Sequence, residues 1–116
     1  MTNKKVALDR IFHALSDQTR LAVVVRLSEG PAAVSELAAP FDMALPSFMQ
    51  HLGVLQNCGL VTSKKKGRVR TFRLTPEPLK AAEHWLEVRR NLWEKRLDQL
   101  VGYLAEMKEQ QDDTNL

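Results

Sequence analysis

Residues 43–61, MALPSFMQHLGVLQNCGLV, predict a helix with one apolar face and an unusual polar one. Its large apolar residues recur every three or four positions and therefore line one face of a helix: Leu45, Phe48, Leu52 and Leu55. The other faces carry uncharged groups, where a solvent-facing helix ordinarily carries Lys and Glu: Pro46, Ser47, Gln50, Gly53 and Asn57. A helix that offers such hydrogen-bonding groups outward is expected to contact something other than water.

The composition bounds the class of protein. A chain of 116 residues, 44% hydrophobic and 27% charged, is typical of one soluble globular domain with a modest core. The net charge of +3 is a weak indication of an acidic partner. The single cysteine, Cys58, cannot form an internal disulfide, which favours a reducing cytoplasm. We find no secretory signal and no membrane-spanning run, and expect a cytoplasmic protein without a membrane partner.

Apolar periodicity and turn signals predict the other elements. Helices are expected over residues 4–15, 19–30 and 32–41, the second capped by Ser16 or Asp17. The β-branched run at 23–25 could form a strand, but its flanking residues favour a helix. The helix over 44–57 should end before Gly59, which suits a left-handed C-terminal position. A hairpin over 62–74 and a long helix over 77–108 should follow, so that residues 1–110 form one domain and 111–116 a flexible tail.

The hairpin concentrates positive charge. Its strands are expected at 60–63 and 68–74, separated by KKKG with Gly67 at the bend. No acid interrupts its six cations: Lys64, Lys65, Lys66, Arg68, Arg70 and Arg73. A solvated basic loop is a common alternative, but like charges crowded on a ribbon repel unless a polyanion relieves them. We therefore expect phosphate contacts here, with Arg68 beside the bend as the best candidate at the tip.

The order of these elements predicts a mainly α fold with a small β-hairpin, helix-helix-helix-helix-strand-strand-helix, which is a winged helix-turn-helix. In that design the second helix of the turn pair enters the major groove of double-stranded DNA. Ser47 and Gln50 are suited to contacting base edges, and Gly53 would let the backbone approach. The alternative for this helix is a core helix with a quiet polar face.

The last helix carries a heptad seam. Its apolar residues are spaced 7, 4, 3, 4 and 3 apart: Leu86, Trp93, Leu97, Leu100, Leu104 and Met107. Trp85 and Trp93 could instead line a ligand pocket, but large apolar residues near a seam favour interface anchors. The seam predicts a homodimer.

The chain resembles the ArsR family of dimeric bacterial repressors over roughly residues 5–105. IFHALSDQTRLAVVVRLSEG, VSELAAPFDMALPSFMQHLGVLQNCGLV and GRVRTFRL carry the resemblance. It implies a homodimeric repressor of operator DNA, in which the first helix, with Leu8 and Phe12, joins the last helix at the dimer interface. It also places Pro46, Ser47, Gln50 and His51 at the DNA. For His51, a DNA contact and a half-buried structural role stay equally open.

Departures from the family pattern concern capping and metal. Gln18 replaces a frequent Pro, Ala44 a Ser or Thr cap, and Gly53 a frequent Lys. The Cys-x-Cys group through which many relatives sense metal is absent, because this region reads VSELAAPF. A set on the last helix, Glu83, His84 and Glu87, is more typical of an exposed face than of metal ligands. We therefore expect no metal and no cofactor.

Other chemistry is weakly supported. Cys58 could be a redox switch but is better explained as a small buried residue at a helix end, and His13 as a packing residue. His51 and Cys58 are seven positions apart on one helix, roughly 10 Å, so they cannot form a nucleophile–base pair. We expect no enzyme. A winged-helix module for protein or RNA, a metal- or redox-responsive repressor and an unknown small-molecule inducer remain alternatives.

Overall fold

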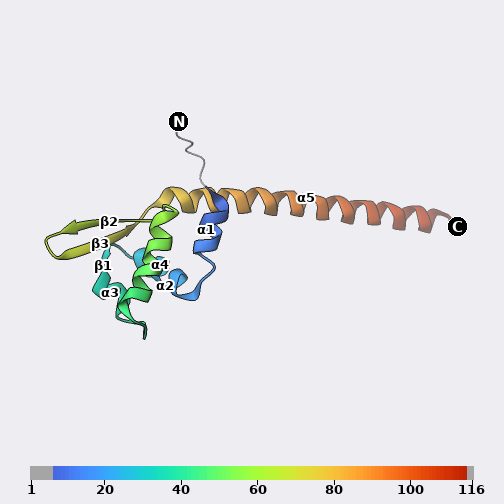
Figure 1. Cartoon of the computed structure of the whole chain (residues 1–116). Coiled ribbons are helices and arrows are strands. Elements are labelled where there is room, and N and C mark those ends of the chain that lie inside the picture. Colours follow the sequence, from blue (N-terminus) through green and yellow to red (C-terminus); the bar gives the residue numbers. More distant parts are fainter. Residues whose placement is uncertain (1–6, 115–116) are drawn as a thin grey trace. The chain divides into compact units, whose positions relative to one another are not determined.

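The computed structural model describes residues 7–114, with side chains up to residue 112. Figure 1 shows the order of its elements. The chain begins with two helices, α1 (Leu8–Ala14) and α2 (Gln18–Leu27), followed by a short strand, β1 (Ala32–Ala33). Two more helices, α3 (Val34–Ala38) and α4 (Leu45–Asn57), precede the strands β2 (Val61–Lys66) and β3 (Val69–Leu74), which form a small sheet with β1. The last helix, α5, spans Pro76–Thr114. This confirms the predicted fold class, with one strand added.

The chain divides into two compact units, one ending at Ala82 and the other beginning at Glu83. The first unit holds α1 to α4, the sheet and the first turns of α5. The second unit is the remainder of α5.

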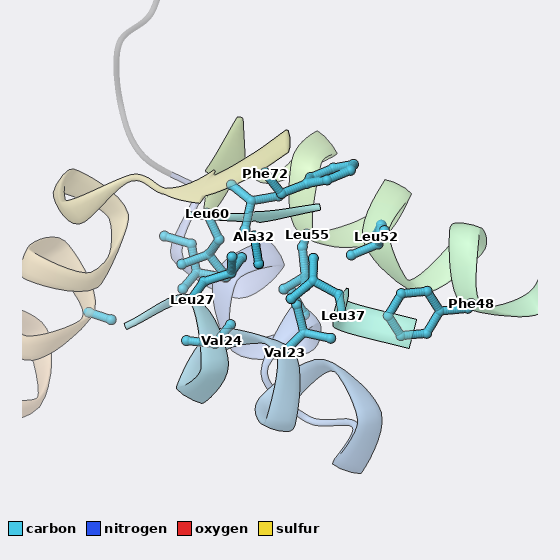
Figure 2. Packing of buried hydrophobic residues seen from close by; sticks show 14 residues of the cluster. Val23, Val24, Leu27, Ala32, Leu37, Phe48, Leu52, Leu55, Leu60 and Phe72 are labelled. Carbon is cyan, nitrogen blue, oxygen red and sulfur yellow. The ribbon is translucent and has the colours of Figure 1, made fainter. Parts of the chain in front are cut away.

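The core of the first unit forms where α2, α3 and α4 meet the base of the sheet. Figure 2 shows Val23, Leu37 and Leu55, one from each of these helices, pointing toward one another. Phe48, Leu52 and Leu55 of α4 are buried as predicted, whereas Leu45 is 56% exposed. Leu45 thus shares the predicted apolar face of the helix but not its burial. The run at 23–25 is helical, as favoured.

Local signals set the ends of α2 and α4. Asp17 caps α2 by accepting the backbone N–H of Arg20 at 3.0 Å. At the other end of α4, Gly59 has φ +84°, a conformation that glycine adopts without strain. The N–H of Leu60 donates to the carbonyl of Leu55, and the N–H of Gly59 to that of Gln56. These are the two bonds of a Schellman motif, so the predicted helix end is confirmed.

The sheet has the order β1-β3-β2 and is antiparallel throughout. Strand β1 was not predicted, because its two alanines fell within the helix expected over 32–41. It pairs only with Thr71 and Phe72, so β2 and β3 continue beyond it as a two-stranded ribbon (Figure 1). Gly67 lies at the bend as predicted, but the prediction that the three lysines before it separate the strands is wrong. All three lysines belong to β2, and only Gly67 and Arg68 form the turn.

Two helix boundaries differ from the sequence prediction. The first helix was expected from residue 4 and begins at Leu8 within the described residues, and residues 4–6 lie outside them. The last helix runs to Thr114, so the predicted end near residue 108 is wrong. Residues 106–111 are Glu, Met, Lys and Gln, which favour a helix, and no Gly or Pro stops the helix before Thr114.

Candidate nucleic-acid interface

Helix α4 has one buried face and one uncharged polar face. Pro46, Ser47 and Gln50 are exposed, and His51 is half-buried. Because residues three and four apart are neighbours on a helix, Ser47, Gln50 and His51 share one face. The structure thus brings these predicted site residues together. Ala44, before the helix, makes no side-chain cap, and Pro46 lies in the first turn, where no backbone N–H is needed.

A hydrogen-bonded cluster that sequence reasoning missed lies behind this face. Arg20 of α2 is buried, and its guanidinium donates to the carbonyl of Ala14 from Nε at 2.8 Å. Nη2 donates to the carbonyl of His13 at 3.3 Å, and Nη1 lies 3.0 Å from Nδ1 of His51. The cluster therefore joins the end of α1 and α2 to α4. The only signal in the sequence was a basic residue three positions after a capping Asp.

Asp17 completes the cluster from its edge. Its side chain is 34% exposed, and Oδ2 lies 3.6 Å from Nδ1 of His51. The hydrogen bond from the backbone N–H of Arg20 to the carboxylate holds the pKa of Asp17 below its usual 3.8, although partial desolvation opposes this. Asp17 is therefore an anion at neutral pH.

The β2–β3 ribbon carries exposed cations on both faces. Paired residues on neighbouring strands point to the same side, so Lys65 and Arg70 share one face. Lys64 and Lys66 point to the other, together with Arg73. The six side chains at 64–66, 68, 70 and 73 are all exposed, and none forms an ion pair with an acid within residues 7–114. Like charges directly opposite each other on paired strands destabilise a ribbon, so a bound anion would reduce the repulsion between these cations.

The ribbon has a defined geometry relative to α4. Gly67, with φ +63°, precedes Arg68 in a two-residue turn of the II′ pattern. At the base, the hydroxyl of Ser63 accepts from Gln56 of α4 at 3.3 Å and from Arg70 of β3 at 2.9 Å. A shallow groove lined partly by Leu45, Arg68 and Arg70 lies between the start of α4 and the ribbon. Sequence reasoning missed Ser63 and Gln56.

The remaining candidate chemistry is sparse. Within residues 7–114, no three His, Cys, Asp or Glu side chains converge in a way that could hold a metal ion. Cys58 is half-buried at the end of α4, and its thiol donates to the carbonyl of Leu55 at 3.3 Å. His13 is exposed, so it does not pack into the core of its own chain. No helix in this part of the chain is long and apolar enough to cross a bilayer.

The predicted dimer residues divide between the units. Leu8 and Phe12 of α1 are half-buried and pack against the core of their own chain. The side chains of the α5 seam are 42–62% exposed: Leu86, Trp93, Leu97, Leu100 and Leu104. Whether either set contacts a second subunit stays a prediction.

Comparison with known proteins agrees with this geometry. The family model for the bacterial regulatory proteins of the arsR family matches residues 17–63, which span the cap of α2 to the base of the ribbon. The HTH-type transcriptional regulator Rv2034 of Mycobacterium tuberculosis is 38% identical over 106 residues, which is 91% of this chain and 94% of that protein. The arsenical resistance operon repressor of Escherichia coli is 37% identical over 68 residues, 58% of each chain.

Solved structures show the same relationship. The crystal structure of an ArsR family transcriptional regulator, RHA00566, is 56% identical, with a TM-score of 0.72 over 75% of this chain and 96% of that one. These relatives are regulators and not enzymes. The chain therefore belongs to the arsR family of bacterial regulatory proteins and is a DNA-binding transcriptional regulator.

Proposed function

We propose that this regulator acts as a homodimeric repressor, in which each subunit places α4 in the major groove of an operator and the ribbon on flanking phosphates. The observation that carries the proposal is the pairing of an uncharged polar helix face with six exposed cations that have no acidic partner among the described residues. Neutral donors and acceptors such as those of Ser and Gln can bond to base edges, whereas exposed cations are attracted to phosphates. The two surfaces match the two parts of a DNA duplex.

Within α4, Gln50 is the leading candidate for base recognition. Its amide is exposed, and an amide can bond bidentately to adenine N6 and N7 in the major groove. Ser47, one turn earlier on the same face, can donate or accept. Pro46 at the exposed start of the helix would face the same groove. Discrimination at one base pair through such a contact is worth about 1–3 kcal/mol.

On the ribbon, Lys64, Lys65, Lys66, Arg68 and Arg70 would neutralise phosphates. Each neutralised phosphate releases condensed counterions, so affinity should fall steeply with salt. The hydrogen bonds of Ser63 to Gln56 and Arg70 support a fixed position of the ribbon beside α4. A ribbon held in this way loses little conformational freedom on binding.

The proposed partner for the α5 seam is a second copy of the chain. Its leucines and Trp93 repeat at heptad spacing and are exposed along one stripe of the helix. A contiguous apolar stripe of this kind is typical of an interface. A two-fold dimer presents two recognition helices, which requires two half-sites about 34–36 Å apart on one side of the duplex. Leu8 and Phe12 are proposed to contribute from α1.

The test is binding of the purified full chain to its own upstream duplex and to a scrambled duplex, by fluorescence anisotropy at several salt concentrations. We expect a preference of at least about a thousandfold for one sequence at physiological salt. Gln50→Ala should reduce that preference, while Gln99→Ala on α5 serves as the matched control. Equal affinity for both duplexes would refute the function as proposed.

A further inference from the structure

Arg20 is an unusual residue to find in the core of the first unit. Only 9% of it is exposed, and no carboxylate of the described residues lies within 4.0 Å of its guanidinium. A buried charge is costly unless its donors are satisfied. Two of the acceptors are the carbonyls of His13 and Ala14, at the end of α1, where the helix dipole favours a cation. The third is the ring of His51 on the recognition helix.

The third contact assigns the tautomer of His51. A guanidinium only donates hydrogen bonds, so Nδ1 must accept from Nη1 at 3.0 Å and cannot itself carry a proton. The carboxylate of Asp17, 3.6 Å from Nδ1, is beyond hydrogen-bond distance and does not compete. The imidazole is therefore neutral, with its proton on Nε2.

The other ring nitrogen faces solvent. Nε2 has no hydrogen-bond partner among the described residues, and no buried side-chain nitrogen or oxygen in that part of the chain lacks one. Solvent must therefore reach Nε2, although the side chain as a whole is only 24% exposed. His51 lies one turn after Ser47 and beside Gln50, on the face of α4 assigned to DNA.

We propose that Arg20 is a positioning residue for DNA recognition: it fixes His51 as a neutral Nε2–H donor aimed at an acceptor atom of the duplex. This rests on the proposed function of α4. It gives His51 both roles that the sequence left open, since Nδ1 is structural and Nε2 contacts DNA. The acceptor is either a phosphate oxygen or a base atom, both of which accept hydrogen bonds.

The tautomer can be measured in the free full-length chain without DNA. Long-range ¹H–¹⁵N spectra distinguish a protonated ring nitrogen from an unprotonated one, and the signals of His51 are those lost in His51→Gln. At neutral pH we expect an unprotonated Nδ1 and a protonated Nε2. A proton on Nδ1, or an equal mixture of tautomers, would overturn the proposal whether or not the chain binds DNA.

Two substitutions separate the roles of the two nitrogens. The side-chain oxygen in His51→Asn can take the place of Nδ1 and keep the Arg20 contact, but it leaves no outward donor. The amide in His51→Gln can donate from the place of Nε2 but leaves Nη1 of Arg20 without its acceptor. We expect His51→Asn to unfold near the wild-type midpoint and to weaken DNA binding about tenfold, the effect of one hydrogen bond to a charged or strong acceptor.

The opposite pattern is expected for His51→Gln, with a lower unfolding midpoint and the smaller loss of affinity. An equal loss on operator and scrambled duplex identifies a phosphate, and a larger loss on the operator identifies a base. Wild-type affinity in His51→Asn overturns the outward contact.

Arg20 itself is tested by Arg20→Lys, which keeps the charge but cannot reach three acceptors with one ammonium. In Arg20→Lys we expect exchange between the two His51 tautomers and a loss of DNA affinity. Adding His51→Asn to this variant should not reduce the affinity further. Multiplied losses would show that Arg20 acts independently of His51 and overturn its positioning role. Arg26→Lys, on the same helix and also bonded to a backbone carbonyl, is the control and should change neither measurement. If the wild-type chain binds no duplex, the proposed function and the contact from Nε2 to DNA are both refuted. The spectra of the free chain then still show which nitrogen of His51 carries the proton.

Discussion

The ribbon provides the sharpest quantitative prediction. Replacing Lys65, Lys66 and Arg68 together with Ala removes three exposed cations that have no acidic partner among the described residues. Each lost phosphate contact should reduce the slope of log affinity against log salt by about 0.9, so the variant should lose up to about 2.7 units. Between 50 and 200 mM salt, wild type should then lose roughly 40-fold more affinity than the variant.

The assay is anisotropy with operator and scrambled duplexes over that salt range. The loss should be similar on both, because phosphates carry no sequence information. A matched control replaces Lys95, Arg96 and Lys108 of α5, which lowers the net charge from +3 to 0 as the ribbon variant does. If the two variants have the same slope, net charge explains the effect and the ribbon does not contact phosphate.

Three further predictions concern the dimer, the cap of α2 and metal. Leu97→Glu places a carboxylate in the seam of α5 and should yield monomers in sedimentation, with much weaker operator binding. The control Gln99→Glu should stay dimeric. A tight dimer of Leu97→Glu would exclude the seam as the interface. Because the pKa of Asp17 is lowered, its stabilising effect is complete above the usual 3.8 and is lost as pH falls through the lowered value. Asp17→Asn can still cap α2 but has no carboxyl to titrate. Its urea midpoint should therefore fall less than that of wild type between about pH 5 and pH 3, the range of carboxyl titration. Equal declines in the two proteins would contradict this. Stoichiometric zinc or arsenite should leave operator affinity unchanged, since the described residues offer no cluster of three ligands; a tenfold loss, about 1.4 kcal/mol of coupling, would reveal a missed site.

Features determined by short-range signals were predictable from the sequence. Asp17 was named as a possible cap, and Gly59 as the left-handed residue after α4, because each conformation depends on neighbours a few positions away. The apolar period likewise placed Phe48, Leu52 and Leu55 in the core. The exposed cations of the ribbon followed from their crowding along the sequence.

Features that depend on distant contacts were not predictable. Strand β1 exists only because Ala32 and Ala33 pair with β3, which lies roughly forty residues later in the chain. The place of Arg20 three positions after the capping Asp17 did not reveal its role, since one of its acceptors, His51, lies on another helix and the others are backbone carbonyls. Leu45 fits the helical period of the apolar residues, yet it lines the groove beside Arg68. The period alone cannot distinguish a buried residue from one that lines a surface groove.

The two-residue turn at Gly67 and Arg68 has a consequence for how this surface can change in evolution. Because side chains alternate between the faces of a strand, one residue inserted directly after Ser63 would move the three lysines of β2 to the opposite face. Two inserted residues, one in each strand, would lengthen the ribbon and leave the pairing intact, yet would also exchange the faces of the residues at the tip. Only additions of two residues per strand preserve both the pairing and the facing of the charges. Among relatives that bind DNA in the same way, ribbon length should therefore vary in steps of four residues, with the glycine of the turn retained at the tip.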